Sequence, residues 1–377
     1  MRWPGSKRQR RRPKGLLAAG VAATALLVTG CIEFEAPTSQ SLGLSPGFTL
    51  TTQAMQVGDF DGDGLDDLLA VSSYQASMET FVLWSNGDGT VTKQSLPAGY
   101  WAEGVGDFNG DGIDDAVIGG PTRVWTGDGS QMAVWFGGQE SETRPRGLTV
   151  QDSEPLPNAI DYDVGDFNGD GVPDLLRETI LYSYYQSYVA WMNDGDAGFT
   201  EDGSVSAFGV ENSGYVMIHR DGRDQVFTLA SFVPGWVDSY PGVTGAVVLG
   251  RGDIDGDGND DVAAMRDGWL VFYRWDGTQY VEFPDYQDIP VADSPRFLDL
   301  VDLDGDGMLD LAYSDASGPR YLGGTADGGF PYESTGIVPT GRAVFVDLDG
   351  DGLLDAVQTS ADGQNLNVYR NLSTPVG

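Results

Sequence analysis

The residues of this sequence that are best suited to chemistry are the acidic side chains of a short motif that occurs six times. The shared pattern is D-x-[DN]-G-D-G-x-x-D, and "GDFNGDGIDDAVIGG" at residues 106–120 contains one copy. Positions 1, 3, 5 and 9 are side-chain oxygen donors in every copy. In chain order, the donors are Asp59, Asp61, Asp63 and Asp67; Asp107, Asn109, Asp111 and Asp115; Asp166, Asn168, Asp170 and Asp174; Asp253, Asp255, Asp257 and Asp261; Asp302, Asp304, Asp306 and Asp310; and Asp347, Asp349, Asp351 and Asp355.

Oxygen donors at this spacing are typical of a calcium-binding loop. Ca²⁺ takes about six to eight oxygen ligands, and the glycines at positions 4 and 6 let the backbone turn where a side chain would obstruct it. An EF-hand is excluded because it needs glutamate at position 12. That position is occupied here by Ala70, Ile118, Arg177, Ala264, Tyr313 and Gln358. The sequence predicts about six bound Ca²⁺ ions, and solvated acidic turns are the alternative.

The spacing of the copies points to a seventh, degenerate repeat. The first aspartates lie 48, 59, 87, 49 and 45 residues apart, so one interval is about twice too long for a single module. Within it, "MIHRDGRDQVFTLASF" at residues 217–232 keeps Asp221, Gly222 and Asp224, but has His219 and Arg220 in place of the leading acids. His219 is the sole histidine of the chain, and we interpret it as structural rather than catalytic.

The residues around each loop indicate the elements that must position it. Position 2 is apolar in all six copies, an apolar run follows position 9, and a second hairpin such as "FVLWSNGDGTVTKQSL" comes next. Four antiparallel strands per module predict an all-β β-propeller, with seven blades favoured over six or eight. The last module is one strand short, so we expect "GFTLTT" at residues 47–52 to close the ring.

The N-terminal segment predicts where the mature chain begins. Residues 1–30 combine a basic stretch with the apolar "GLLAAGVAATALLVTG", which is typical of a signal peptide. The sequence "LVTGC" resembles a bacterial lipobox, which implies lipidation of Cys31, the single cysteine; an ordinary signal peptide is the alternative. We expect residues 31–46 to form a flexible tether and residues 47–377 to form the propeller. The protein would then be an exported lipoprotein of the outer membrane, the cell surface or the periplasm.

The charge of the chain limits its partners. Seven of the 21 basic residues and none of the 57 acidic residues lie within residues 1–30, which leaves 14 basic and 57 acidic residues and a net charge of −43. Such a surface repels a phosphate backbone, so we expect no nucleic-acid partner. It suits divalent cations instead. The sequence does not indicate an oligomeric state.

The six acidic loops, with Gly-Asp-Phe-like entries, resemble the FG-GAP/VCBS repeat superfamily over residues 47–375. The resemblance implies a propeller related to that of integrin α-chains, with Ca²⁺ held by the loop residues named above. The Gly-Ala-Pro element of the family is missing, which favours a bacterial branch of the superfamily.

Three functions are compatible with these features. The first is binding or adhesion to a glycan or protein at the cell surface, for which Trp101 and Trp236 are candidate contact residues. We expect Trp84, Trp135 and Trp191, at equivalent hairpin positions, to pack between blades. The second is a polysaccharide-acting, lyase-like enzyme; we predict no catalytic residue and consider this function the less favoured. The third is a structural scaffold of a surface complex.

Overall fold

The computed structural model describes residues 32–373 except 76, 98, 121–129, 140–145, 149–152, 160, 182–184, 211–214, 229–239, 244–245, 284–287, 294, 326–327 and 335. The predicted signal peptide and Cys31 lie outside the described residues. The described part contains β-strands and no helix, which confirms the all-β class. It accordingly contains no apolar helix of membrane-crossing length.

The strands form seven antiparallel sheets that follow one another along the chain. The first three sheets are β2 (Thr49–Gly58), β3 (Asp67–Tyr74), β4 (Ser77–Ser85) and β5 (Val91–Ser95); β6 (Trp101–Gly106), β7 (Asp115–Gly119), β8 (Ser130–Trp135) and β9 (Ser153–Ala159); and β10 (Asp161–Gly165), β11 (Asp174–Leu181), β12 (Tyr185–Asn193) and β13 (Phe199–Val210). The other four are β14 (Tyr215–Arg220) and β15 (Arg223–Thr228); β16 (Val247–Gly252), β17 (Asp261–Arg266), β18 (Trp269–Trp275), β19 (Tyr280–Glu282) and β20 (Ile289–Pro290); β21 (Phe297–Val301), β22 (Asp310–Asp315), β23 (Gly318–Gly323) and β24 (Tyr332–Glu333); and β25 (Val344–Val346), β26 (Asp355–Thr359), β27 (Asn365–Tyr369) and β1 (Thr38–Ser41).

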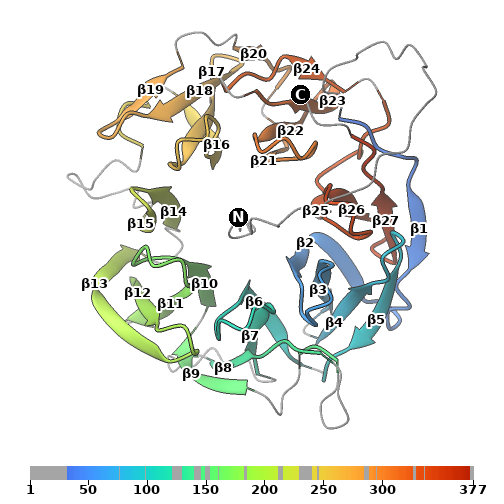
Figure 1. The fold of residues 1–377 in the computed structure, drawn as a ribbon, viewed down its shortest axis with the longest axis vertical. Helices are drawn as coiled ribbons and strands as arrows, with labels where there is room; N and C mark the ends of the chain where they lie inside the picture. The colour runs from blue at the N-terminus through green and yellow to red at the C-terminus, as the bar shows by residue number, and fades with distance from the viewer. Residues whose placement is uncertain are drawn as a thin grey trace, which may run out of the picture.

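Figure 1 shows the seven sheets in a ring, with the first strand of each sheet nearest the centre. This is the predicted seven-bladed propeller. Five blades have four strands; in four of them each strand pairs with the next one along the chain, and in the last blade β1 from the N-terminal segment pairs with β27. The two exceptions are the β14–β15 blade, for which the structure describes two strands, and the next blade, which gains the short β20 beside β18.

The cores lie between neighbouring blades, which explains why the middle strands are continuous apolar runs. Phe60, at position 2 of the first acidic loop, is fully buried. It packs with Leu69 and Val82 of its own blade and with Ala116 and Trp135 of the next blade. A strand covered on both faces gains burial from every side chain rather than from alternate ones, so its sequence does not alternate.

The ring is closed by the N-terminal segment, but not by the residues that the sequence indicated. Residues 49–58 form β2, the first strand of the first blade. The missing outer strand of the last blade is β1, which pairs with β27 from Thr38↔Val368 to Ser41↔Asn365 (Figure 1). The prediction that the N-terminus closes the ring is therefore confirmed, and the choice of residues 47–52 is wrong.

The predicted tether over residues 31–46 is also wrong within its described part. Besides forming β1, this segment buries Ile32 and Phe34, which are 1% and 2% exposed. Both side chains lie in a cluster with Leu303, Tyr321 and Ala356 of the last two blades. Apolar burial on this scale holds the segment on the ring, despite its Ser- and Pro-rich composition.

Candidate metal centres

The six acidic phrases form loops that join the first and second strands of six blades. We call them loops 1 to 6, over residues 59–67, 107–115, 166–174, 253–261, 302–310 and 347–355. Hydrogen bonds connect neighbouring loops: the Asp59 backbone N donates to Asp114 Oδ2 over 3.0 Å, and the Asp347 backbone N donates to Asp66 Oδ2 over 3.3 Å. These loops therefore share one face of the ring, which we call the metal-loop face.

Each loop is organised by its own carboxylates. In loop 1 the two Asp59 oxygens accept the backbone N–H groups of Gly62 (2.7 Å) and Gly64 (3.0 Å). These glycines have φ values of 72° and 88°, a region that L side chains rarely adopt. The Asp63 Oδ1 accepts the N–H of Leu65 over 2.9 Å. This fold of the backbone turns the acidic side chains toward one point.

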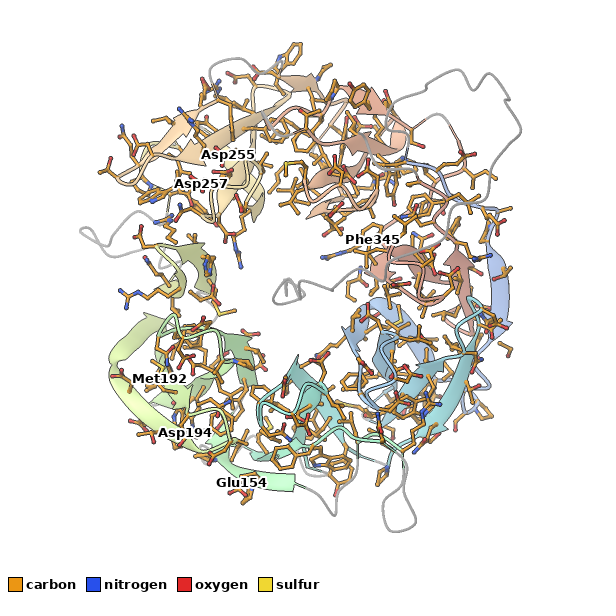
Figure 2. The ribbon with its side chains drawn as sticks, in the orientation of Figure 1. Glu154, Met192, Asp194, Asp255, Asp257 and Phe345 are labelled. Carbon is orange, nitrogen blue, oxygen red and sulfur yellow. The ribbon has the colours of Figure 1, made fainter. Side chains whose placement is uncertain are left out.

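The structure brings three carboxylates of a loop together in four of the six loops. In loops 1 and 4 positions 1, 3 and 9 converge, and in loops 5 and 6 positions 1, 3 and 5 converge, with one oxygen of each within 4.8 Å of the others. Asp255 and Asp257 of loop 4 lie at the end of the β16–β17 hairpin (Figure 2). In loops 2 and 3 the position-3 residue is asparagine, and Asn109 Nδ2 and Asn168 Nδ2 donate to the position-5 carboxylates over 3.2 and 2.8 Å.

The position-9 aspartates are buried and fasten the loop to the blade. Asp115 is fully buried; its Oδ2 accepts the N–H of Phe108 (3.0 Å), and its Oδ1 accepts the N–H of Gly137 after β8 (2.9 Å). Asp174 and Asp310 are bonded in the same way. Burial is the main cause of raised pKa values in this set, to about 8 for Asp67, Asp115 and Asp261, about 7 for Asp310 and Asp355, and about 6 for Asp174.

The loops fit a divalent cation. Asp253 Oδ1 is a buried carboxylate oxygen that has no hydrogen-bond partner in the structure, as expected of an atom that ligates a metal. The donors are oxygens without sulfur or imidazole, which is the set that hard cations such as Ca²⁺ prefer. A bound cation would keep these carboxylates ionised despite their burial.

We expect the calcium-free protein to lose stability as pH rises from about 5 to 8. The carboxylates of the unfolded chain ionise near pH 4, whereas folded Asp67, Asp115 and Asp261 hold their protons up to about pH 8. The folded state then binds more protons, so the free energy of unfolding falls with rising pH. Thermal melts in chelator at four pH values test this, and the same melts in excess Ca²⁺ are the control. A melting temperature that rises with pH in chelator would contradict the prediction.

Three segments of the chain match the family model of the FG-GAP-like repeat, at residues 59–118, 253–313 and 302–358. Each begins at position 1 of a loop. These three segments are FG-GAP-like repeats. The resemblance inferred from the acidic loops is thereby confirmed, and a lipoprotein type within the family stays a prediction.

Solved structures that match the chain come from varied proteins, and the matches are distant. A lectin of Agrocybe aegerita that recognises non-reducing terminal N-acetylglucosamine is 15% identical, with a TM-score of 0.38 over 85% of this chain and 80% of the lectin. The Tc holotoxin pore of Photorhabdus luminescens is 20% identical, with a TM-score of 0.42 over 90% of this chain and 15% of the toxin chain. BBS1N, crystallised with ARL6DN, is 10% identical, with a TM-score of 0.44 over 91% and 99%. No curated protein matches the chain.

The FG-GAP-like loops contain a further functional position that sequence reasoning missed. An aspartate at position 8 forms a link to the preceding blade: Asp114 Oδ2 accepts the Asp59 N–H, and the Asp114 N–H donates to the Asp59 carbonyl over 2.9 Å. Asp260 makes the same two bonds with His219. Aspartate recurs at position 8 only in loops 1, 2 and 4, so the pattern alone did not distinguish it from a solvated acid.

The seventh repeat has lost its metal loop. In place of eight residues, a two-residue turn of Asp221 and Gly222 joins β14 to β15, with φ values of 54° and 79°. Positive φ at both residues is the conformation of a tight hairpin turn, for which Asp-Gly is favoured. His219 Nδ1 lies 3.0 Å from Asp224 Oδ1, and Asp224 Oδ2 accepts the N–H of Asp166 in loop 3. The interpretation of His219 as a structural residue agrees with these contacts.

An arginine occupies the place of the apolar position-2 residue in this repeat. Arg220 is 4% exposed. Its guanidinium lies 4.2 Å from the Trp275 ring centre and donates to the Tyr280 hydroxyl from Nη2 over 2.9 Å. A buried cation on two aromatic faces thus joins the β14–β15 blade to the next blade.

Arginines also contact two of the candidate metal loops. Arg146 pairs with Asp61 of loop 1 and lies 3.3 Å from Asp63. Arg370 Nε lies 2.9 Å from Asp349 Oδ2 in loop 6. In both loops an arginine offsets part of the acidic charge at position 3.

The structure confirms one part of the prediction for the tryptophans and contradicts another. Trp84 and Trp135 are buried at 3% and 2% exposure, and Trp191 packs against the core between the second and third blades, which confirms their packing role. Trp101 is only 5% exposed, and its indole N–H donates to Glu103.

The choice of Trp101 as a surface contact is therefore wrong, because its position next to a loop in sequence is the start of a buried strand. Trp236 lies outside the described residues. Trp269, which the sequence did not single out, is 44% exposed at the tip of the β17–β18 hairpin. The Asp-Gly turn just before it was the available signal.

Proposed function

We propose that this FG-GAP-like propeller is a calcium-stabilised protein, anchored to a membrane through Cys31, that binds a glycan or a protein at the cell surface. The calcium part is supported by one observation above all: three carboxylates converge in each of four loops that recur around the ring. Loops 2 and 3 contribute three carboxylates and one amide each, which gives about six sites in total. Ca²⁺ accepts such mixed oxygen sets.

Membrane attachment is supported by the sequence of the leader and by the single cysteine that follows it. A binding role suits a propeller because rigid blades present many loops and hairpin tips at their two faces. Two exposed aromatic side chains at hairpin ends, Tyr74 and Trp269, are each 44% exposed. They are of the type that contacts sugars or peptide side chains.

Removing two ligands of loop 1 should abolish one calcium site without unfolding the ring. In the Asp63→Asn/Asp67→Asn variant, we expect the stoichiometry of Ca²⁺ binding to fall by one from about six, because neutral amides ligate Ca²⁺ more weakly than carboxylates. Isothermal titration calorimetry measures this. Asp88→Asn, which removes an exposed acid from the β4–β5 turn on the same face, is the matched control. Equal stoichiometry in both variants would refute the assignment of loop 1.

The partner class can be separated by two assays on the calcium-loaded protein. Binding on a glycan array that is lost in Trp269→Ala would support glycan recognition. Capture of a defined surface protein, with an inert array, would support a protein partner. The contacts of His219 are structural, so no observation on the described residues favours the lyase-like enzyme.

A further inference from the structure

The first described residues, 32–34, are held on the ring by buried side chains and by backbone hydrogen bonds. Ile32 and Phe34 are buried between the last two blades, and the Phe34 ring meets the Tyr321 ring at 5.7 Å in an edge-on contact. Between them, the Glu33 N–H donates to Ser373 Oγ over 3.0 Å, and the Glu33 carbonyl accepts the N–H of Leu372 over 2.8 Å. Residues 32–34 are therefore packed as part of the ring.

This segment lies at the metal-loop face. β26 begins at Asp355, the last residue of loop 6, so β26 runs away from that face and the antiparallel β27 returns to it. β1 pairs antiparallel with β27, and Thr38 stands opposite Val368 near the C-terminal end of β27. Residues 32–37 precede β1 and so lie on the side of the metal loops.

Contacts of Asn371 support the same placement. Asn371 forms a bridge with Phe34. Its Nδ2 donates to the carbonyls of Leu303 in loop 5 (2.7 Å) and Leu354 in loop 6 (2.9 Å). The chain thus enters the ring beside loops 5 and 6.

From this geometry we propose that the metal-loop face lies against the membrane and that the opposite face points outward. The inference rests on the lipidation of Cys31 proposed above. Cys31 is the residue directly before Ile32, and consecutive Cα atoms are about 3.8 Å apart. Because Ile32 is buried, no free residues separate Cys31 from the ring, so a lipid on Cys31 would enter the bilayer close to the metal-loop face.

The outward face then carries the exposed aromatic side chains. Tyr74 is the last residue of β3, and Trp269 is the first residue of β18. Both positions are at the strand ends far from the metal loops, because β3 and β17 begin at their loops. Val247, the first residue of β16, is 59% exposed at the same end. A partner would be recognised there, while the acidic loops face the headgroups with their charge partly offset by bound cations.

The two ends of one strand provide a matched test. Ser77 and Asn86 are exposed, uncharged residues at opposite ends of β4. They are about 30 Å apart at about 3.3 Å per residue. Ser77→Cys lies on the outward face and Asn86→Cys lies on the metal-loop face. Since Cys31 is the single native cysteine and its sulfur would carry the lipid, a thiol-reactive donor dye labels only the introduced residue.

The labelled, lipidated proteins are incorporated into phosphatidylcholine vesicles that hold an acceptor dye on their headgroups, in the presence of Ca²⁺. We expect stronger energy transfer from Asn86→Cys than from Ser77→Cys. Equal transfer, or stronger transfer from Ser77→Cys, in protein that floats with the vesicles would overturn the orientation while leaving the anchor intact. A Cys31→Ser protein that still floats, or a wild-type protein that does not, would overturn the anchor and the orientation together.

Discussion

Removing divalent cations should lower the melting temperature of the protein by about 20 °C or more. A site that is filled at a hundredfold excess over its Kd contributes about 2.7 kcal/mol to folding, so six sites contribute on the order of 16 kcal/mol. In a large domain each kcal/mol shifts the melting temperature by about 2 °C. The position-1 and position-3 carboxylates that converge in loops 1, 4, 5 and 6 also repel one another without metal, which adds to the loss.

Differential scanning calorimetry in excess chelator, and again after Ca²⁺ is restored, measures the effect. Mg²⁺ at the same concentration is the control, because the smaller ion demands octahedral geometry and dehydrates reluctantly; we expect it to recover only part of the loss. If the melting temperature in chelator stayed within about 2 °C of the loaded protein, the loops would be acidic turns and the calcium assignment would be abandoned.

The acidic loops and the ring were predictable from sequence because both depend on a local pattern that repeats. Positions 1 to 9 of each loop specify a turn, and the apolar position 2 specifies its packing; Phe60, Phe108 and Phe167 are all buried. A single copy would have been ambiguous. Six copies at intervals of about one blade indicate a repeat architecture. In such an architecture each blade buries its two apolar faces against its neighbours, because it cannot bury them alone.

What the sequence concealed are contacts between distant segments. Asp114 and Asp224 look like further acids in an acidic chain, yet each accepts a backbone N–H from the preceding blade. Arg220 looks like a solvent-exposed cation, yet Trp275 and Tyr280 cover it. In each case the partner lies tens of residues away, so neither local composition nor periodicity indicates the contact.

The N-terminal segment shows how composition can outweigh a better local signal. The Ser- and Pro-rich "EAPTSQS" favoured a tether, but the preceding "IEFE" at residues 32–35 alternates apolar and charged residues. Alternation is typical of a half-buried extended segment. The structure follows it: Ile32 and Phe34 are buried, and Glu33 and Glu35 are exposed.

This alternation supports a second prediction of large effect. We expect the Ile32→Ala/Phe34→Ala variant to lose about 5 kcal/mol or more of unfolding free energy, because truncation of a buried Ile or Phe costs about 2–5 kcal/mol each. The loss should be larger than the cavity cost alone, since these side chains hold β1 beside β27 and close the ring. Urea unfolding in saturating Ca²⁺ measures it without interference from the metal sites.

The control is the complementary variant Glu33→Ala/Glu35→Ala, which changes the same four-residue stretch but leaves both buried side chains in place. Its backbone bonds to Ser373, Leu372 and Arg370 are retained, and it removes two acids from a highly acidic chain, so we expect stability within about 1 kcal/mol of wild type. Equal losses in the two variants would mean that the segment contributes through its charge or its backbone, and that Ile32 and Phe34 do not close the ring. A loss confined to the Ile32→Ala/Phe34→Ala variant would show that the stability of the propeller depends on side chains next to Cys31. The segment that closes the ring would then be the same segment that joins the ring to any lipid anchor at that cysteine.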